Sequence, residues 1–416
     1  MKLFNDPEVF ARVQRLPPHV RAVIDELRAA ALARGEDVVD LSAANPDGAA
    51  PPAVTEALRS AVGEGGWHRY QHPRGIPALR EAAAAWYQRR HGVSLDADRE
   101  VMATLGTKEG IGHALIALLQ EHDAVLAPAP AHPIHAYGAV LAGGDTIPVP
   151  VGPDLDFMES LLAATERAGD RRPRGIVVNF PASPTGAVAT PELFQKIVRF
   201  AEARNLFILS DLAYGDIVFD GARAPSLLQV PGGRDRTLEF VSLSKSYDMP
   251  GWRVGIAAGN HALVSALARV KSYLDAGPFG AVQVAASVAL NECDGFVDEV
   301  RERYRRRRDA LALAFGAAGW SVPPPAATLC AWAPIPAPLR HLGSLEFSRR
   351  LLQEAGVAVA PGVAFGAAGE GYVRIALVQD EGRVREAAGR VHAFLERAAA
   401  GARPGSGPAP RGGDPA

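Results

Sequence analysis

Apolar runs typical of buried β-strands alternate with helical patterns through the middle of the chain. Continuous apolar strands that are separated by helices are typical of a mostly parallel sheet with helices on both of its faces. The pattern therefore predicts an α/β fold across residues 50–290. The predicted strands are 101–105, 124–127, 175–180, 206–210, 238–243 and 254–258, and helices between them are predicted at 109–120 and 191–204.

The length of the chain predicts more than one domain, because a single core stops growing at about 250–300 residues and this chain has 416. We expect an N-terminal arm over residues 1–49, a large domain over 50–292 and a smaller α+β domain over 293–400. Residues 401–416 are rich in glycine and proline and are expected to be disordered. The elements that predict the smaller domain are helices at 295–317, 344–354 and 381–398 and strands at 328–333 and 372–377, and a helix at 20–33 could pack against either domain.

The composition argues against several classes of function. A formal net charge of −2 provides no general attraction to nucleic acid or to an anionic membrane. The basic run at 301–308 contains acidic residues as well, which is typical of a solvated helix face. No apolar run has the length of a membrane span, and the interrupted N-terminus lacks the apolar region of a secretory signal. The two cysteines, Cys293 and Cys330, form no metal-binding or disulfide pattern, so we expect a cytoplasmic protein.

Polar residues at the ends of the predicted strands mark the expected binding site. In open α/β sheets, ligands bind beyond the carboxyl ends of the strands. Thr107 and Lys108 open a helix after the first of these strands, where free backbone N–H groups attract an anion. Asp211 closes another strand, and Tyr214 follows it. An ordinary turn could also explain Thr107 and Lys108, and a helix cap could explain Asp211.

Lys245 follows a predicted apolar strand directly. A lone lysine usually extends to solvent, but a partly buried lysine has a lowered pKa and becomes a nucleophile for carbonyl groups. Ser242, Ser244 and Arg253 stand nearby and offer donors for a phosphate. A phosphate-bearing aldehyde that is captured by a lysine describes pyridoxal 5′-phosphate (PLP), whose ring nitrogen Asp211 would keep protonated.

The stretch VSLSKSYDMPGWRVG at 241–255 resembles the cofactor-lysine signature of class I and II (fold type I) aminotransferases. Within that superfamily, residues 16–392 resemble the bacterial alanine (glutamate–pyruvate) aminotransferases. The resemblance implies the PLP-dependent transferase fold type I, with a mostly parallel seven-stranded sheet in the large domain and a smaller α+β domain. Other similar stretches are RGEDVVDLSAANPDGAAPP, RYQHPRGIPALR, GTKEGIGHAL, HPIHAYGAV, SDLAYGDIVFDG, APSLLQVPG, LVSALARVKSY, GSLEF and YVRIAL.

The same resemblance implies a role for each candidate residue. Lys245 corresponds to the lysine that forms a Schiff base with PLP, Asp211 to the partner of the pyridinium nitrogen, and Tyr214 to the donor to the 3-oxygen of the ring. Arg374 corresponds to the arginine that binds the substrate α-carboxylate. Tyr70 corresponds to a tyrosine that reaches the phosphate in the neighbouring subunit, which implies a homodimer. The positions that match the phosphate site are Thr107, Lys108, Ser242, Ser244 and Arg253.

Several positions around the expected pocket depart from the family pattern. Ser183 replaces an asparagine that bonds the 3-oxygen, and His132 replaces a tyrosine that stacks on the ring. Ala44 stands where a glycine usually meets the substrate carboxylate. Cys330 replaces an aromatic residue near the substrate, and Gly280 replaces a threonine from the neighbouring subunit. The family residues Lys245, Asp211, Tyr214, Arg253 and Arg374 are all present in this sequence. The departures therefore predict retained PLP chemistry with an altered substrate.

We therefore expect a PLP-dependent aminotransferase that moves an amino group between an L-amino acid and a 2-oxo acid. The family default is L-alanine plus 2-oxoglutarate giving pyruvate plus L-glutamate. The departures leave a second hypothesis open, in which the same fold catalyses β-elimination, decarboxylation or racemisation. A PLP-sensing regulator is a third hypothesis, but the chain offers no room for a DNA-binding module.

Two histidines stand close together in the sequence and could be read as a metal site. His132 and His135 are three residues apart, which is a possible spacing for two ligands of one ion. No further ligand stands near them in the sequence, so we expect no bound metal.

Overall fold

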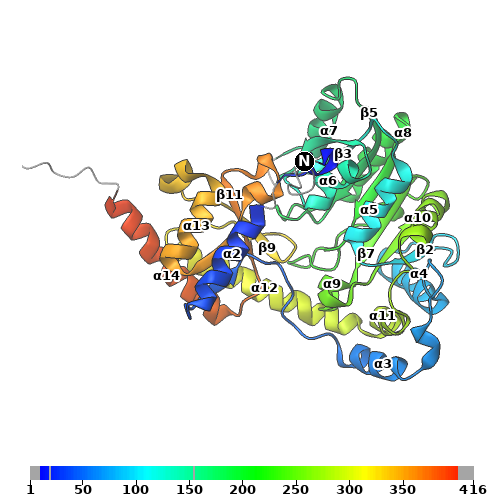
Figure 1. The fold of residues 1–416 in the computed structure, drawn as a ribbon, viewed down its shortest axis with the longest axis horizontal. Coiled ribbons are helices and arrows are strands. Elements are labelled where there is room, and N and C mark those ends of the chain that lie inside the picture. Colours follow the sequence, from blue (N-terminus) through cyan, green and yellow to red (C-terminus); the bar gives the residue numbers. More distant parts are fainter. Residues whose placement is uncertain (1–9, 18–19, 153–154, 402–416) are drawn as a thin grey trace, which may run out of the picture.

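The computed structural model describes residues 10–17, 20–152 and 155–401, and two sheets lie side by side in it (Figure 1). The larger sheet has seven strands in the order β2-β8-β7-β6-β5-β3-β4. Strand β8 is antiparallel to both of its neighbours, and the other pairs are parallel. The strands are β2 (Val101–Thr104), β3 (Asp123–Ala129), β4 (Asp145–Pro150), β5 (Arg172–Asn179), β6 (Phe207–Asp211), β7 (Thr237–Ser242) and β8 (Gly255–Gly259).

Helices cover both faces of the seven-stranded sheet. Neighbouring residues of a strand point to opposite faces, so each strand packs side chains against helices on both sides. In β2, Val101 and Ala103 pack into a core on one face, whereas Met102 packs into another core on the opposite face. The α/β class with a mostly parallel sheet is thus confirmed. The helices on the first face are α4 (Pro77–His91), α7 (Phe157–Glu166), α8 (Pro191–Ala203) and α11 (Gly280–Glu292), and those on the second are α5 (Thr107–Leu118), α6 (Pro133–Leu141) and α10 (His261–Leu274).

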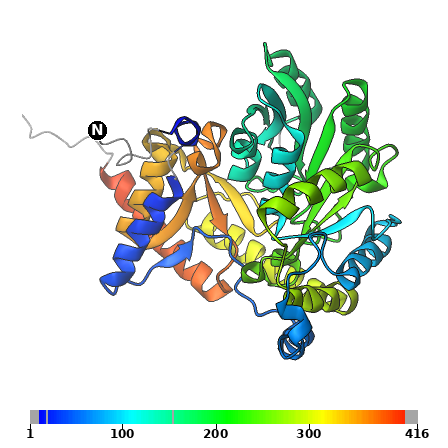
Figure 2. The same cartoon turned by 45° about the vertical axis from the view of Figure 1, so that its right-hand side comes forward.

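The smaller sheet has the strand order β1-β10-β11-β9. Strand β1 (Val39–Leu41) comes from the N-terminal arm and pairs in parallel with β10 (Val357–Pro361). Figure 2 shows helix α2 (Val20–Ala33), in blue, beside the orange and red C-terminal elements. The arm therefore packs against the C-terminal part of the chain. The remaining elements here are β9 (Cys330–Pro334), β11 (Tyr372–Ala376), α12 (Asp294–Ala317), α13 (Gly343–Ala355) and α14 (Glu381–Gly401).

The predicted domain boundaries stay predictions, since helix α12 contributes to two cores. Its residue Val297 packs in the core that contains β2 and β8, whereas Val300 and Leu311 pack with the smaller sheet. Helix α14 ends at Gly401, the first residue of the predicted tail. The rest of that predicted tail, 402–416, lies outside the described residues. Among the described residues, no helix combines the length and apolar character that crossing a membrane requires.

Candidate active site

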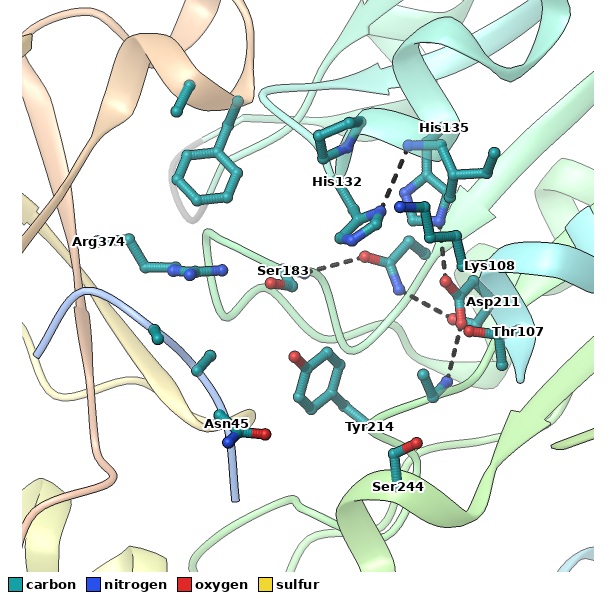
Figure 3. Close-up of a pocket in the computed structure, with 18 of the residues that line it drawn as sticks. Asn45, Thr107, Lys108, His132, His135, Ser183, Asp211, Tyr214, Ser244 and Arg374 are labelled. Carbon is teal, nitrogen blue, oxygen red and sulfur yellow. Dashed lines mark hydrogen bonds and ion pairs between the residues drawn. The ribbon is translucent and has the colours of Figure 1, made fainter. Parts of the chain in front are cut away.

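A cavity of 1470 Å³ lies between the carboxyl ends of the large sheet and the smaller sheet. Figure 3 shows Arg374 reaching in from one side, Thr107, Lys108 and Asp211 from the other, and Tyr214 between them. Twelve of the predicted residues line this cavity, so the fold brings them together from distant parts of the chain. They are Ala44, Thr107, Lys108, His132, Ser183, Asp211, Tyr214, Ser242, Ser244, Lys245, Arg253 and Arg374.

Lys245 lies in α9 (Leu243–Ser246), a single helical turn that begins where β7 ends. The hydroxyl of Ser242 accepts a hydrogen bond from the backbone N–H of Ser244 at 3.2 Å, which caps this turn. The lysine Nζ lies 3.5 Å from the carbonyl oxygen of Ala44 and 5.8 Å from the ring centroid of Tyr214. Burial, with Arg374 and Arg253 nearby, lowers the pKa of Lys245 to about 8, and Asp211 and Cys330 oppose this shift. A substantial fraction of the amine is therefore neutral near pH 8.

Asp211 ends β6 and is held from two sides. His135 Nε2 lies 2.8 Å from its Oδ2, and the backbone N–H of Ala213 donates to its Oδ1 at 3.1 Å. His135 is fully buried, and its Nδ1 has no hydrogen-bond partner among the described residues. Asn179 Nδ2 donates to the backbone oxygen of Asp211 at 2.9 Å. These contacts fix the direction of the carboxylate, which faces the cavity (Figure 3).

Tyr214 and Ser183 meet in the middle of the cavity. Tyr214 is buried, and burial raises the pKa of its phenol, although a hydrogen bond with the Ser183 side chain opposes the shift. The backbone N–H of Ser183 donates to Asn179 Oδ1 at 2.9 Å, so Asn179 joins the Ser183 loop to the Asp211 strand. The Ser183 hydroxyl thus contacts the Tyr214 phenol, and both were predicted to bond the 3-oxygen of the ring.

Donors for an anion gather at one end of the cavity. Thr107 and Lys108 are the first residues of α5, and the N–H groups of a helix's first turn have no partner within the helix. Gly106 before them has φ of 84°, and a Cβ there would lie 2.5 Å from Arg253 Nη2. Ser242 and Ser244 line the same cavity. Hydroxyls, an ammonium, a guanidinium and a helix N-terminus are together suited to a phosphate.

Arg374 forms the opposite end of the cavity. Its Nη2 donates to the backbone oxygen of Ser42 at 3.0 Å, and its guanidinium carbon lies 4.7 Å from the ring centroid of Phe365. The residue is 5% exposed, and its Nε is buried without a hydrogen-bond partner among the described residues. A buried guanidinium with unused donors is suited to a carboxylate. Ala44, two residues after Ser42 in the sequence, lies on the cavity wall.

His132 caps helix α6 through its side chain. Its Nδ1 accepts a hydrogen bond from the backbone N–H of Ile134 at 3.3 Å, and the two imidazole centroids are 5.9 Å apart. Burial, together with the nearby charges of Lys108 and Arg374, lowers the pKa of His132 well below its ordinary value, although part of the residue stays open to the cavity. The ring is therefore neutral at physiological pH.

The remaining candidates lie outside the cavity wall. Tyr70 is 93% exposed. Gly280 begins α11, and a Cβ there would lie 2.8 Å from the backbone oxygen of Trp67, so the close approach of these segments explains the glycine. Cys330 is fully buried in the core that contains Tyr214.

Sequence reasoning missed the contributions of Asn179, His135 and Ser42. Asn179 ends β5 and is the register partner of Asp211, so the rule that ligands bind at strand ends could have identified it. His135 was considered only as a metal ligand. Ser42 acts through its backbone oxygen, for which a residue type gives no signal.

Comparisons with known proteins identify the family. The model of the family described as aminotransferase class I and II matches residues 36–391. The chain belongs to the class I and II aminotransferases. It is a transaminase, and members of this family depend on pyridoxal phosphate.

Individual relatives of this aminotransferase differ in their named substrates. The chain is 48% identical to a Rhizobium meliloti protein named aminotransferase AatC (94% of this chain, 96% of the relative). It is 46% identical to the Escherichia coli glutamate-pyruvate aminotransferase AlaC (91% and 92%). It is 40% identical to the LL-diaminopimelate aminotransferase of Gloeobacter violaceus (92% and 97%). Among solved structures, substrate-bound BacF from Bacillus subtilis superposes with a TM-score of 0.87 at 30% identity, over 92% of this chain and 97% of BacF.

Proposed function

We propose that this aminotransferase transfers the amino group of an L-amino acid to a 2-oxo acid, with PLP bound to Lys245. The observation that carries the proposal is a buried amine with a pKa of about 8, in one cavity with an anion site, a carboxylate and a buried arginine. L-Alanine and 2-oxoglutarate are the proposed substrates, because the 46% identical relative is named a glutamate-pyruvate aminotransferase.

The chemistry of the cavity fits PLP at each of its functional groups. Thr107, Lys108, Ser242, Ser244 and Arg253 supply donors for the phosphate. Asp211 offers the carboxylate that a protonated ring nitrogen needs, and Tyr214 and Ser183 offer hydroxyls for the ring oxygen. When bound, the cofactor supplies an electron sink for the negative charge that develops at the substrate α-carbon.

The residues of this chain then have separate tasks. Arg374 binds the α-carboxylate and so orients the substrate α-carbon toward Lys245. Lys245, once its amine is free, removes the proton from the substrate α-carbon as a base and later gives a proton up as an acid at a different carbon, which is general acid–base catalysis by a group with a pKa near the working pH. His135 and Asn179 keep Asp211 in place. His132 presents a neutral ring where the family has a tyrosine.

The pH dependence of cofactor binding follows from the lowered pKa of Lys245. Only the neutral amine attacks an aldehyde, and the neutral form predominates above pH 8 because the pKa is about 8. The association rate of PLP with the apoprotein is therefore expected to rise about 10-fold per pH unit below pH 8 and to level off above it. Stopped-flow absorbance measures this rate. A rise that continues to pH 10 would contradict the burial of this amine.

The substrate assignment is tested by half-reactions of the loaded enzyme with single amino acids. L-Alanine and L-glutamate are expected to convert the bound cofactor to its pyridoxamine form, as seen by the loss of its long-wavelength absorbance. LL-Diaminopimelate is the matched competitor, because a 40% identical relative is named for it and the cavity of 1470 Å³ is large. Faster conversion by LL-diaminopimelate than by L-alanine would overturn the substrate pair and leave transamination intact.

A second candidate activity is another PLP reaction, such as β-elimination, which the changes at His132, Ser183 and Ala44 favour. β-Elimination releases ammonia without a 2-oxo acid acceptor. Ammonia release from serine or cysteine, with no pyridoxamine form of the cofactor, would support this activity against transamination.

We also propose that the enzyme is a homodimer in which Tyr70 completes the site of the neighbouring subunit. Its 93% exposure leaves it free to reach another chain, and Tyr273 and Leu274 are 88% and 56% exposed. A monomeric mass in sedimentation at micromolar concentration would contradict this. The cytoplasmic location also stays a prediction.

A further inference from the structure

A cluster of four charged or titratable side chains lies behind the anion-binding end of the cavity. The ammonium of Lys271 is fully buried and donates to Glu109 Oε1 at 2.9 Å and to Asp275 at 2.8 and 3.1 Å. His113 Nδ1 lies 2.5 Å from Glu109 Oε1 and 3.4 Å from Asp275 Oδ2. Because Glu109 and His113 belong to α5 and Lys271 to α10, the cluster joins two helices.

The cluster could be taken for a metal site. Ligand atoms of Glu109, His113 and Asp275 lie within 4.8 Å of one another. The ammonium of Lys271, however, already donates to both carboxylates. The chain thus supplies its own cation between these carboxylates.

Glu109 connects the cluster to the anion-binding turn. Its Oε2 accepts a hydrogen bond from the backbone N–H of Leu105 at 2.7 Å. The backbone oxygen of Leu105 accepts from Arg253 Nη2 at 3.1 Å. Both polar backbone groups of Leu105 are therefore held, and the turn that leads to Thr107 and Lys108 begins at this residue.

The negative charge of Glu109 would weaken phosphate binding at this turn unless another charge neutralised it. Glu109 is in the first turn of α5, whose N-terminus faces the anion site. A carboxylate so close to a bound phosphate repels it, because both are negative. The ammonium of Lys271, 2.9 Å from Oε1, offsets this charge while Oε2 still holds Leu105.

We propose that Lys271 is a positioning residue for the cofactor phosphate, acting through Glu109. It holds the carboxylate that fixes the turn at Leu105, and it cancels the charge of that carboxylate. Lys271 is fully buried and does not line the cavity, so it acts without touching the phosphate. This inference rests on the proposed function, because it requires a phosphate-bearing cofactor.

The test compares two aldehydes that differ only in the phosphate, PLP and pyridoxal. Apoprotein with Lys271→Met is titrated with each, and binding is followed by absorbance. We expect the affinity for PLP to fall about 10-fold to 100-fold, by analogy with residues that orient metal ligands, and the affinity for pyridoxal to change little. Lys196→Met, at an exposed site on α8, is the matched control and keeps both affinities.

A second pair of variants keeps the test decisive if Lys271→Met does not fold, since breaking a buried ion pair can be strongly destabilising. Glu109→Gln keeps an oxygen for the Leu105 N–H and removes the charge, and Glu109→Ala removes both. Each leaves the Lys271–Asp275 pair intact. We expect Glu109→Gln to bind PLP as the wild type does, and Glu109→Ala to lose affinity for PLP but not for pyridoxal.

The outcomes separate the two proposals. If Lys271→Met and Glu109→Ala leave the ratio of PLP affinity to pyridoxal affinity unchanged, the proposed role of Lys271 is wrong. Binding of PLP by the wild-type apoprotein would still support the proposed function in that case. Failure of the wild-type apoprotein to bind PLP would overturn both.

Discussion

Replacement of Lys245 by alanine is expected to lower kcat for transamination by about 10⁴-fold, the upper range of a general acid–base contribution. The amine lines the cavity, and its lowered pKa makes it a base near neutral pH. Single-turnover kinetics with L-alanine measures the loss. Circular dichroism should show an unchanged fold, because truncation at the cavity wall removes no core packing.

Two controls make the Lys245 prediction specific. Lys196→Ala changes an exposed lysine on α8 and should retain full activity. Added methylamine should restore part of the activity of Lys245→Ala, because a small amine fits the space that the side chain leaves. Retention of more than about a tenth of wild-type kcat by Lys245→Ala would remove this residue from the proton transfer.

Replacement of Arg374 by alanine is expected to lower kcat/KM for L-alanine by about 10³-fold, as two charge-assisted hydrogen bonds are lost. Arg374 is 5% exposed, and its buried Nε has no hydrogen-bond partner among the described residues, so the guanidinium has a donor left for the carboxylate. Steady-state kinetics checks the value. Arg374→Lys should recover only part of it, because a lysine cannot bind a carboxylate in a fork.

A substrate without a carboxylate is the matched control for Arg374. Ethylamine is alanine without its α-carboxylate, so its slow reaction should be nearly the same in the wild type and in Arg374→Ala. Arg199→Ala, at an exposed site on α8, should leave both substrates unaffected. Equal losses for alanine and ethylamine would show that Arg374 supports the cavity wall instead of binding the carboxylate.

The fold was predictable where strands are long, apolar and fully buried. The runs at 175–180 and 206–210 correspond to β5 and β6 within a few residues. Strand β4 was missed because its six residues include Pro148 and Pro150, which argue against a strand, yet it lies at the edge of the sheet where proline is tolerated. Strand β1 has three residues, and its pairing with β10 joins positions more than 300 residues apart.

The candidate site was predictable to the extent that its chemistry lies in side chains at strand ends. Asp211, Ser242 and Lys245 follow or end buried strands, and they line one cavity. The brace from His135 to Asp211 spans 76 residues and the contact between Arg374 and Ser42 spans 332, so no local pattern could predict them. Each contact forms only once segments that are distant in the sequence have folded together.

The central claim is that Lys245 carries the cofactor covalently. Enzyme loaded with PLP, reduced with borohydride, digested with a protease and analysed by mass spectrometry tests it most directly. We predict a pyridoxyl group on the peptide that contains Lys245 and on no other lysine. An adduct on Lys108 or Lys271, or no adduct at all, would contradict the account.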